Sequence, residues 1–504
     1  MTERARHSFS EKLWIVMATG LLLRLYQIGN DPFWFDELNV LQIASRPTLL
    51  EAIRATAEHV MAMPSHYVLV WLAAKISTAE GWMRLPEAIW GTLAIGMGYQ
   101  VARSYLTPSQ SQWAAALMAI APILIRYSQE LRFYSALVFF YLLAVFFGIR
   151  AIQRDRLKDW VIYCLVTSLG ITFHVYVLLS WFIVMAYFFS SELSTEPPKV
   201  YRRLLRSTII LLIIFLGLLI AFGKMADQAF RLNEEGHLFW IILAGIGWAP
   251  SYATTSGGWL YYCLIVFSGV LGFLQWTRLE SQKKTAIFLF ISIVVQISLV
   301  ALFNVLGEYF IDPRQLIFLL PFVSFYSAFG LEMTSQWIEQ RIDSNYIHRG
   351  QMRVGIFMLV MVSGLLTLAQ YYQVEKGIVR EGLPALQERW QEKDLICIFP
   401  ESDAVTYTYY WLSTFGNVIF PCDELSRGEL SKVRFILAPP NWVPKDGYRL
   451  IFKPDKPTFY ERWIWEKITR THTLNLIRNV LTISISSVTP FSYMSILYYA
   501  HIEL

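Results

Sequence analysis

Long apolar runs that carry almost no charge constrain the fold of this chain more than any other feature of its sequence. Two of them are residues 207–223 (STIILLIIFLGLLIAFG) and 285–306 (TAIFLFISIVVQISLVALFNVL). Each is long enough for a helix to cross the hydrocarbon core of a bilayer, which takes about 20 apolar residues. Only 16% of the 504 residues are charged, whereas a soluble chain carries roughly a quarter. The sequence therefore predicts a polytopic α-helical membrane protein.

Eleven apolar segments are expected to cross the membrane, and two shorter ones are not. The segments 66–79 and 238–250 are too short or too interrupted for a span, because runs of about 10–14 apolar residues more often lie at an interface. The expected spans are 13–28, 84–105, 111–127, 132–149, 158–172, 173–190, 207–223, 257–276, 285–306, 313–331 and 353–372.

Basic residues decide the orientation of these spans. If 66–79 does not cross, four basic clusters fall on the same side as the N-terminus, as the positive-inside rule expects. If 66–79 crosses and 238–250 does not, all four clusters fall on the opposite side. We therefore expect a multi-pass plasma-membrane protein with its N-terminus in the cytoplasm and its C-terminus outside, and an endoplasmic-reticulum membrane as the alternative. The clusters are Arg150/Arg154/Arg156/Lys158, Lys199/Arg202/Arg203/Arg206, Arg278/Lys283/Lys284 and Arg341/Arg349/Arg353.

Three segments are expected outside the membrane: 29–83, 224–256 and the tail from 373. In the first, residues 48–60 are predicted to form a surface helix. Thr48 and Glu51 have the spacing of a capping box. The apolar face of this helix would be formed by Leu49, Leu50, Ile53, Ala57 and Val60.

The tail is predicted to fold as a small α/β domain. Apolar stretches bounded by Pro, Gly and Asp indicate strands, and helical patterns lie between or after them. Cys397 and Cys422 can pair if this domain meets an oxidising compartment. The expected strands are 394–400, 417–421, 433–439 and 448–454, and the expected helices are 376–393 and 457–471.

Ionisable residues gather at the outer ends of the expected spans. Such residues are expensive near hydrocarbon, so they are functional candidates. The acidic pair Asp36 and Glu37 follows the first span. Further clusters are Arg126–Tyr134 (RYSQELRFY), His174 with Tyr176, and Glu308–Arg314 (EYFIDPR).

Cations on the outer side run against the positive-inside rule, and a bound anion would explain them. A guanidinium group suits phosphate oxygens, which it can bind with two parallel hydrogen bonds. A carboxylate among such cations can accept a proton from an incoming hydroxyl. The cations are Arg84, Arg126, Arg132, Lys224, Arg231 and Arg314.

Each of these residues also has a purely structural interpretation. Asp36 and Glu37 can stabilise the N-terminus of a helix, and Arg84 can pair with Glu87 one turn later. His174 can be a hydrogen-bonded residue of the interface. A zinc site formed by Glu58, His59 and His66 has little support, since no further ligand has suitable spacing.

At these residues the sequence resembles the GT-C superfamily, in particular the bacterial lipid-linked-sugar transferases similar to protein O-mannosyltransferases and aminoarabinose transferases. The motifs occur in the family's order over roughly residues 10–330. They are Trp34-Phe35-Asp36-Glu37, Arg84-Leu85-Pro86, Ser128-Gln129-Glu130-Leu131-Arg132-Phe133-Tyr134, and Pro313-Arg314 running into Leu319-Leu320-Pro321-Phe322.

The resemblance implies a GT-C-like transmembrane catalytic module at 1–372 and an extracytoplasmic α/β domain at 373–504. It implies an inverting glycosyltransferase that moves a hexosyl or pentosyl group from a polyprenyl-phosphate donor to a hydroxyl of a protein, lipid or glycan. Asp36 aligns with the acidic residue taken as general base. The expected catalytic residues are Asp36 and Glu37, and the residues expected to bind the donor phosphate or substrate are Arg84, Arg126, Gln129, Glu130, Arg132, Tyr134, His174, Tyr176, Lys224 and Arg314.

The resemblance implies no cofactor and no catalytic metal, and it leaves a non-catalytic divalent cation open; no nucleic-acid partner is expected. The sequence departs from the family pattern at three places. The run Met63-Pro64-Ser65-His66 replaces His-Pro-Pro, Glu87 replaces a small residue after Leu-Pro, and Gln315 replaces an aromatic residue after Arg314.

Two other classes of protein are also polytopic. A transporter or flippase is the main alternative, but transporters place ionisable groups near the bilayer midplane on interrupted helices of repeated halves. Here those groups lie at span ends. The second alternative is a binding or assembly subunit without chemistry of its own, against which the acidic pair and the outer arginines count.

Overall fold

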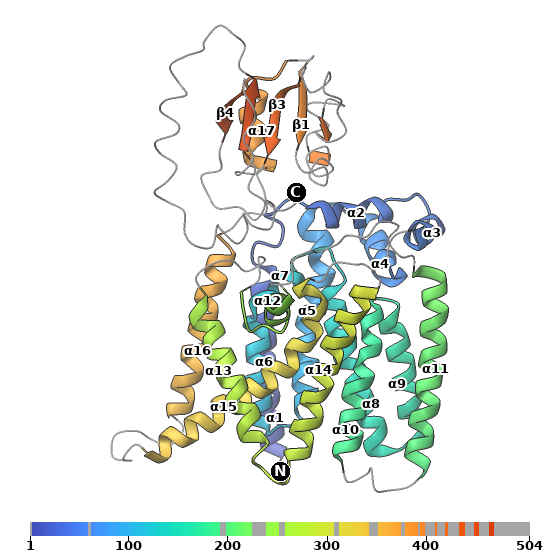
Figure 1. Cartoon of the computed structure of the whole chain (residues 1–504), viewed down its shortest axis with the longest axis vertical. Helices are drawn as coiled ribbons and strands as arrows, with labels where there is room; N and C mark the ends of the chain where they lie inside the picture. The colour runs from blue at the N-terminus through green and yellow to red at the C-terminus, as the bar shows by residue number, and fades with distance from the viewer. Residues whose placement is uncertain are drawn as a thin grey trace. The chain divides into compact units, whose positions relative to one another are not determined.

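The structure is a computed structural model, shown in Figure 1. It describes residues 3–58, 62–191, 198–223, 238–250, 258–306, 312–341, 351–373, 379–391, 394–398, 409–410, 419–421, 433–438, 448–452 and 463–467.

The chain divides into two compact units. One, the helical unit, comprises Met1–Gly29 and Val40–Tyr371, and the other, the sheet unit, comprises Asn30–Asn39 and Tyr372–Leu504. The sheet unit thus includes ten residues that the sequence places in the first outer loop. One reason is a pair of contacts of Phe33: its backbone N–H donates to the Tyr410 hydroxyl at 2.6 Å, and its ring meets Tyr409 edge to face.

The described part of the helical unit consists mainly of helices (Figure 1). Six of its described helical segments are long and apolar enough to cross a membrane, judged by length and composition. The expected number of eleven spans stays a prediction. The helices are α1 (Glu3–Leu25), α2 (Phe35–Ala44, shared with the sheet unit), α3 (Leu49–Glu58), α4 (Pro64–Ala74), α5 (Glu80–Ala102), α6 (Pro108–Ile120), α7 (Pro122–Ser128), α8 (Tyr134–Arg154), α9 (Leu157–Ile171), η1 (Val175–Leu179), α10 (Ser180–Ser190), α11 (Pro198–Phe222), α12 (Leu238–Gly245), α13 (Trp259–Trp276), α14 (Lys283–Leu306), η4 (Pro313–Leu319), α15 (Leu320–Arg341) and α16 (Gln351–Tyr371).

The two segments considered too short for a span are short helices in the structure. Helix α4 has 11 residues and α12 has 8, against the roughly 20 that a span requires. The expected span 111–127 is divided, because Pro122 lacks an N–H group and holds Ala121 in an extended conformation (φ −60°, ψ 117°) between α6 and α7.

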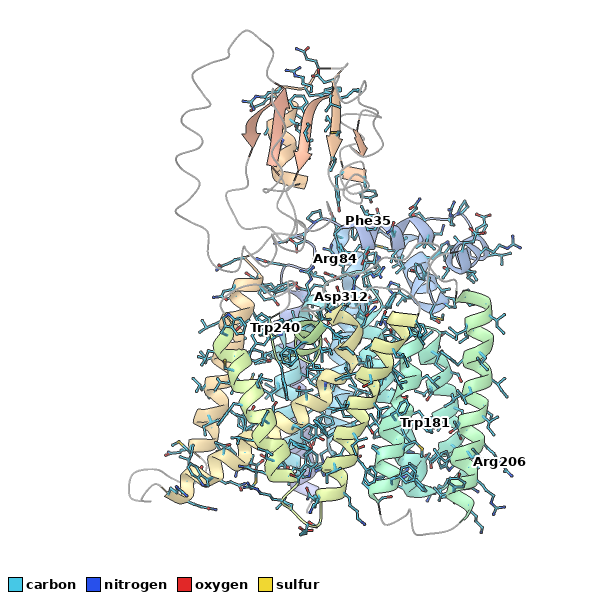
Figure 2. All side chains as sticks on the ribbon, in the orientation of Figure 1. Phe35, Arg84, Trp181, Arg206, Trp240 and Asp312 are labelled. Atoms are coloured by element: carbon cyan, nitrogen blue, oxygen red, sulfur yellow. The ribbon has the colours of Figure 1, made fainter. Side chains whose placement is uncertain are left out.

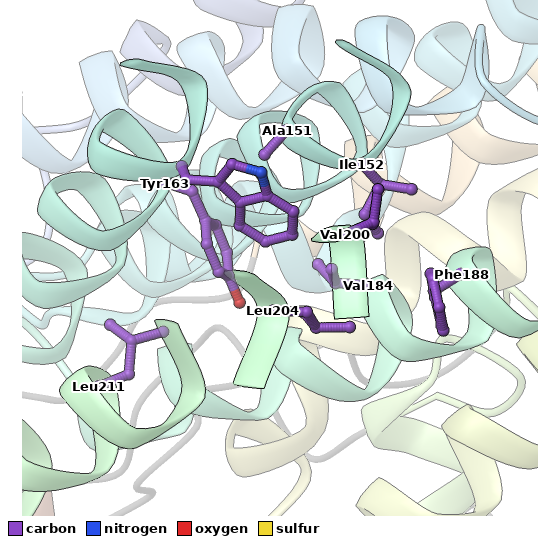
Figure 3. Packing of buried hydrophobic residues seen from close by; sticks show 9 residues of the cluster. Ala151, Ile152, Tyr163, Val184, Phe188, Val200, Leu204 and Leu211 are labelled. Carbon is purple, nitrogen blue, oxygen red and sulfur yellow. The ribbon is translucent and has the colours of Figure 1, made fainter. Parts of the chain in front are cut away.

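The helices pack through a mixture of large apolar and small residues. Figure 3 shows one buried cluster, in which α8, α9, α10 and α11 meet. Helices α13 and α15 approach most closely at Gly272 and Gly330. A Cβ on Gly272 would lie 1.9 Å from the Tyr326 carbonyl oxygen, and one on Gly330 would lie 1.9 Å from that of Ser268. Small residues at such crossings let two membrane helices pack backbone to backbone.

Helix α3 begins where the sequence predicts. The Thr48 hydroxyl accepts a hydrogen bond from the Glu51 N–H at 3.3 Å, which satisfies one of the free N–H groups of the first turn. The expected apolar face is not the buried face: Leu50 is 56% exposed, whereas Ala52 and Thr56 are buried. Helix α3 packs on α4, and small side chains permit this close approach. Val60 lies outside the described residues.

The sheet unit contains helix α17 (Val379–Gln387) and a five-stranded mixed sheet in the order β2-β1-β3-β5-β4. Strand β1 pairs in parallel with β2 and β3, and β5 pairs antiparallel with β3 and β4. The strands are β1 (Leu395–Ile398), β2 (Ile419–Pro421), β3 (Val433–Ala438), β4 (Tyr448–Phe452) and β5 (Trp463–Lys467).

Four strands lie inside the segments expected to form strands, but the helix expected at 457–471 is wrong at 463–467, which is β5. The residues Trp463, Ile464 and Trp465 have the aromatic and β-branched side chains that favour strands. Pairing on both edges, with Ile464 opposite Leu437 of β3 and Phe452 of β4, outweighs the local helical pattern.

Candidate functional site

The polar motif of residues 128–134 is held in place by a buried arginine that the sequence analysis did not single out. The Arg24 guanidinium, in α1, donates to Ser128 Oγ at 3.1 Å and to the Ala119 carbonyl oxygen, at the end of α6, at 3.2 Å. A cation at a helix C-terminus is favourable because the last carbonyl groups carry partial negative charge. Gly91 makes room for this contact, since a Cβ there would lie 2.8 Å from Arg24 Nε.

Gln129 links three parts of the helical unit rather than pointing to an open site. Its side-chain NH₂ group donates to the carbonyl oxygens of Arg24 and Tyr26, at 3.0 and 2.6 Å, and its carbonyl oxygen accepts from the Tyr371 hydroxyl at 2.9 Å. Both ends of the amide are therefore engaged. This geometry favours a structural role for Gln129, connecting the end of α1 to the end of α16.

The structural interpretation of Arg84 expected a pair with Glu87, and the structure does not show this pair. Its Nη1 donates to the Ile28 carbonyl oxygen at 3.0 Å, just beyond the end of α1. Glu87 instead lies 3.3 Å from His66 Nδ1. Arg84 is only 1% exposed. Its hydrogen bond to Ile28 stabilises the turn after the first helix.

Arg126 and Glu130 form a buried ion pair one turn apart. Arg126 Nε lies 2.5 Å from Glu130 Oε1, and the two side chains are 2% and 0% exposed. This pairing compensates part of the charge of Arg126, so less attraction is left for a further ligand.

Tyr176 and Arg314 lie on two short 3₁₀ helices, η1 and η4, and each helix is capped by a polar side chain. His174 Nδ1 accepts from the Tyr176 N–H at 3.1 Å and so begins η1. Asp312 Oδ1 accepts from the Arg314 N–H at 3.0 Å and begins η4 with a capping box completed by Gln315. The ring of Tyr176 packs against Phe318 of η4, with centroids 5.9 Å apart. The caps fix the backbone from which Tyr176 and Arg314 project.

His174 lies in the turn between α9 and η1, outside both helices. Its Nδ1 acts as the acceptor for the Tyr176 N–H, as a capping side chain requires. The geometry favours a capping histidine over a proton donor.

Arg132 and Arg314 converge on one aromatic ring. The guanidinium carbon of Arg132 lies 5.9 Å from the Tyr134 ring centroid, and that of Arg314 lies 5.7 Å from it. Arg132 also lies over Phe133, at 4.9 Å. We call Arg132, Tyr134 and Arg314 the guanidinium cluster. Cation–π contacts hold such planar groups in place.

Asp312 supplies negative charge beside this cluster. Its carboxylate lies 3.5 Å from Arg314 Nε, and both side chains are about nine-tenths buried (10% and 8% exposed). Tyr127 lies within electrostatic range of Asp312, Arg314, Glu130 and Arg126, which places the Arg126–Glu130 pair in the same polar region. Arg132 and Arg314 lie around one ring, and the Asp312 carboxylate contacts Arg314. This region is suited to an anion with several oxygens.

The polar region lies near one end of the helical unit. Figure 2 labels Arg84 and Asp312 near that end, and Arg206 of α11 toward the other. Arg206 belongs to one of the four basic clusters assigned to the cytoplasmic side. The two groups of arginines are therefore separated along the helices, as the expected sidedness requires.

The acidic pair belongs to the sheet unit and to the first turn of α2. Glu37 is buried, and its Oε2 accepts from the Trp34 backbone N–H at 3.2 Å. This is the returning hydrogen bond of a capping box, so the structural interpretation of Glu37 has direct support. Asp36 is half-buried.

Several residues named in the sequence analysis lie outside the described residues, among them Lys224, Arg231, Cys422 and His59. Cys397 lies in β1 and is disulfide-bonded. In the part of the chain that the structure describes, no group of three or more His, Cys, Asp or Glu side chains is placed to hold a metal ion. The expectation of no catalytic metal stays a prediction.

Sequence reasoning missed Arg24, Tyr371 and the partner of Glu87. Arg24 carried a signal, because it is the one basic residue inside the first apolar run, and an ionisable residue within a span marks a special site. Tyr371 and His66 carried none, since their partners lie far away in the chain.

Comparisons with known proteins agree with this architecture. Residues 62–225 match the family described as dolichyl-phosphate-mannose-protein mannosyltransferase. No curated protein sequence matches the chain.

Solved structures similar to the chain include the apo form of ArnT from Cupriavidus metallidurans, with 12% identity over 90% of this chain and 98% of that one and a TM-score of 0.52. They also include the oligosaccharyltransferase of Archaeoglobus fulgidus. Its apo form has 12% identity over 87% of this chain and 70% of that one, with a TM-score of 0.53. AglB from the same organism, in complex with an inhibitory peptide and a dolichol-phosphate, has 13% identity with the same coverage and a TM-score of 0.51.

Proposed function

We propose that this chain, a multi-pass membrane protein with the GT-C fold, is an inverting glycosyltransferase that uses a polyprenyl-phosphate sugar as donor. The acceptor is a hydroxyl group at the outer face of the membrane. The resemblance of its motifs, the matching family and the structural neighbours support a glycosyltransferase. The donor, the stereochemical course and the orientation belong to the proposal.

The observation that carries the proposal is the guanidinium cluster. Arg132 and Arg314 reach it from separate elements, the 129–133 turn before α8 and the 3₁₀ helix η4, and they lie within 6 Å of the same ring. A phosphate monoester or diester offers several oxygens to two such groups at once. The same contacts neutralise the charge that builds up on the phosphate as the glycosidic bond breaks.

An apolar groove of the helical unit offers a surface for the isoprenoid chain of a lipid-linked donor. The groove has a volume of about 210 Å³ and lies between α10 and α14. Helix α10 continues directly from η1, whose Tyr176 contacts η4 of the cluster. An isoprenoid chain needs only apolar contact. The groove is lined by Trp181, Phe182, Met185, Ala186, Phe189, Phe288, Ile291, Ser292 and Val295.

Asp36 is proposed as the general base. In a single displacement the acceptor hydroxyl attacks C1 of the sugar while the lipid phosphate leaves with the bonding electron pair. The phosphate is already a good leaving group, so the base and the alignment of the acceptor set the rate. Because Glu37 caps α2 through Trp34, Asp36 is the better candidate of the pair.

The decisive experiment uses the full-length protein in detergent or nanodiscs. The enzyme is incubated with a panel of radiolabelled polyprenyl-phosphate hexoses and pentoses and with candidate protein, lipid and glycan acceptors. Released polyprenyl phosphate is measured together with labelled product. We expect release of polyprenyl phosphate with one donor class and inversion at C1. Retention of the donor's anomeric configuration in the product would contradict a single displacement. A folded protein that binds none of the donors would remove the proposed donor class.

A further inference from the structure

We propose that the buried pair of His66 and Glu87 positions Arg132 and His174 for binding of the donor phosphate, a role that rests on the proposed function. The pair joins α4, in the first outer loop, to α5. Neither residue is among those expected from the sequence to act at the site, and both are described in full by the structure.

The pair is fully enclosed. His66 Nδ1 lies 3.3 Å from Glu87 Oε1, and the side chains are 0% and 1% exposed. Taking two such groups out of water is costly, and their mutual attraction often does little more than offset that cost. A buried pair is therefore a weak device for stability alone, and its best-attested use is to fix one arrangement of the elements that it joins.

A single ring connects the pair to the guanidinium cluster. The His66 ring meets Phe133 edge to face, with centroids 5.7 Å apart and planes at 89°. Phe133 in turn contacts the Arg132 guanidinium at 4.9 Å and the His174 ring, also at 4.9 Å. The Phe133 ring therefore lies between the pair and two residues of the candidate site, and its position depends on that of His66.

A second contact ties the start of α4 to the segment that carries His174. The Ser65 N–H donates to the Thr172 carbonyl oxygen at 3.0 Å, and the two hydroxyl groups are 2.6 Å apart. Thr172 precedes His174 by two residues. Adjacent residues of α4 thus hold both segments of the site: Ser65 holds the turn before η1, and His66 holds Phe133.

The pair also accounts for two of the three departures from the family pattern. His66 stands in the run that replaces His-Pro-Pro, and Glu87 stands where a small residue is usual. In the structure the two departures are partners. Either one alone would leave an ionisable group buried without its partner, which is strongly unfavourable, so the two substitutions make physical sense together.

The alternative is that the pair only fastens α4 to α5, and a matched control separates the two roles. The Trp82 indole N–H, in α5, donates to the Ala73 carbonyl oxygen, in α4, at 3.0 Å. The W82F variant removes this tie between the same two helices and leaves His66, Glu87 and Phe133 unchanged. The test compares W82F with E87Q, H66Q and the double variant H66Q/E87Q.

Two measurements are made on the full-length protein. The first is the Kd for polyprenyl phosphate, together with KM and kcat for the donor. We expect E87Q and H66Q each to raise Kd by about fivefold, which lies within the roughly 2- to 150-fold range of coupling between contacting residues. The double variant should be no weaker than the worse single one, and kcat should change by less than about twofold because the lost contact is made in the ground state as well. W82F should bind as the wild type does.

The second measurement does not depend on activity. The ¹⁹F spectrum of 4-fluorophenylalanine incorporated at position 133 should shift in E87Q, H66Q and the double variant but not in W82F. An unchanged spectrum in the folded double variant, or wild-type Kd in that variant, overturns the positioning role even if the single variants fail to fold. If the wild type binds no polyprenyl phosphate but the spectrum shifts as expected, the contact between the pair and Phe133 stands and the proposed donor is wrong.

Discussion

Replacing Arg314 should weaken donor binding, and the neighbouring Asp312 carboxylate should limit how much affinity is lost. Loss of one charge-assisted hydrogen bond costs about 1.5–3 kcal/mol, equivalent to roughly 10- to 150-fold in Kd. Arg314 Nε is 3.5 Å from Asp312 Oδ1, so part of its charge is compensated before any phosphate arrives. We therefore expect R314A to raise the Kd for polyprenyl phosphate by an amount near the lower end of this range, about tenfold.

Variants at the same position separate charge from geometry. R314K keeps the charge but loses the planar group that lies over Tyr134 at 5.7 Å, so it should restore only part of the affinity. R314A removes the guanidinium that lies beside the buried Asp312 carboxylate, which lowers stability. The double variant D312N/R314A removes that carboxylate while Asn can still cap η4, so it should recover stability without recovering affinity.

Binding is measured by titrating polyprenyl phosphate into the purified protein, with the unfolding temperature of each variant recorded in the same buffer. R206A is the control, because Arg206 is exposed and lies toward the other end of the helical unit (Figure 2). Wild-type Kd in a folded R314A, or an equal loss of affinity in R206A, would refute the assignment of the phosphate to Arg314.

Three further predictions concern catalysis, packing and topology. D36N should lower the single-turnover transfer rate by about 10²- to 10⁴-fold with donor Kd unchanged, and E37Q should do less because Glu37 caps α2; the reverse ranking would make Glu37 the base. G91A should lower the free energy of unfolding by about 1–3 kcal/mol, since its Cβ would lie 2.1 Å from Ser128 Oγ; an unchanged unfolding midpoint in detergent would show that the site tolerates the methyl group. A membrane-impermeant thiol reagent applied from outside should label E51C but not K158C, both at exposed positions. Labelling of K158C alone would show that the orientation is the opposite of the expected one.

The resemblance to the GT-C superfamily, inferred from four short ordered motifs, is confirmed by the matching family and by the structural neighbours. None of the motifs required a tertiary structure to be recognised. They are defined by residue type and order, and those are properties of the sequence alone.

Local rules also predicted much of the architecture. Hydropathy and length located the long apolar helices, Thr48 marked the start of α3, and four strands of the sheet lie where apolar runs end at turn residues. These features depend on neighbours a few residues apart, whose interactions the sequence displays directly. Strand β5 was mistaken for a helix because its choice depends on two partner strands.

The partners of the polar residues were decided by tertiary structure. The sequence put Gln129, Arg132 and Glu87 in the right motifs, but only the fold shows that Gln129 ties α1 to α16 and that Glu87 meets His66. The distinction is physical. A helix or a span is stabilised by contacts one turn apart and by the surrounding solvent, whereas a buried polar atom needs a partner wherever the packing brings one, 242 residues away in the case of Gln129 and Tyr371.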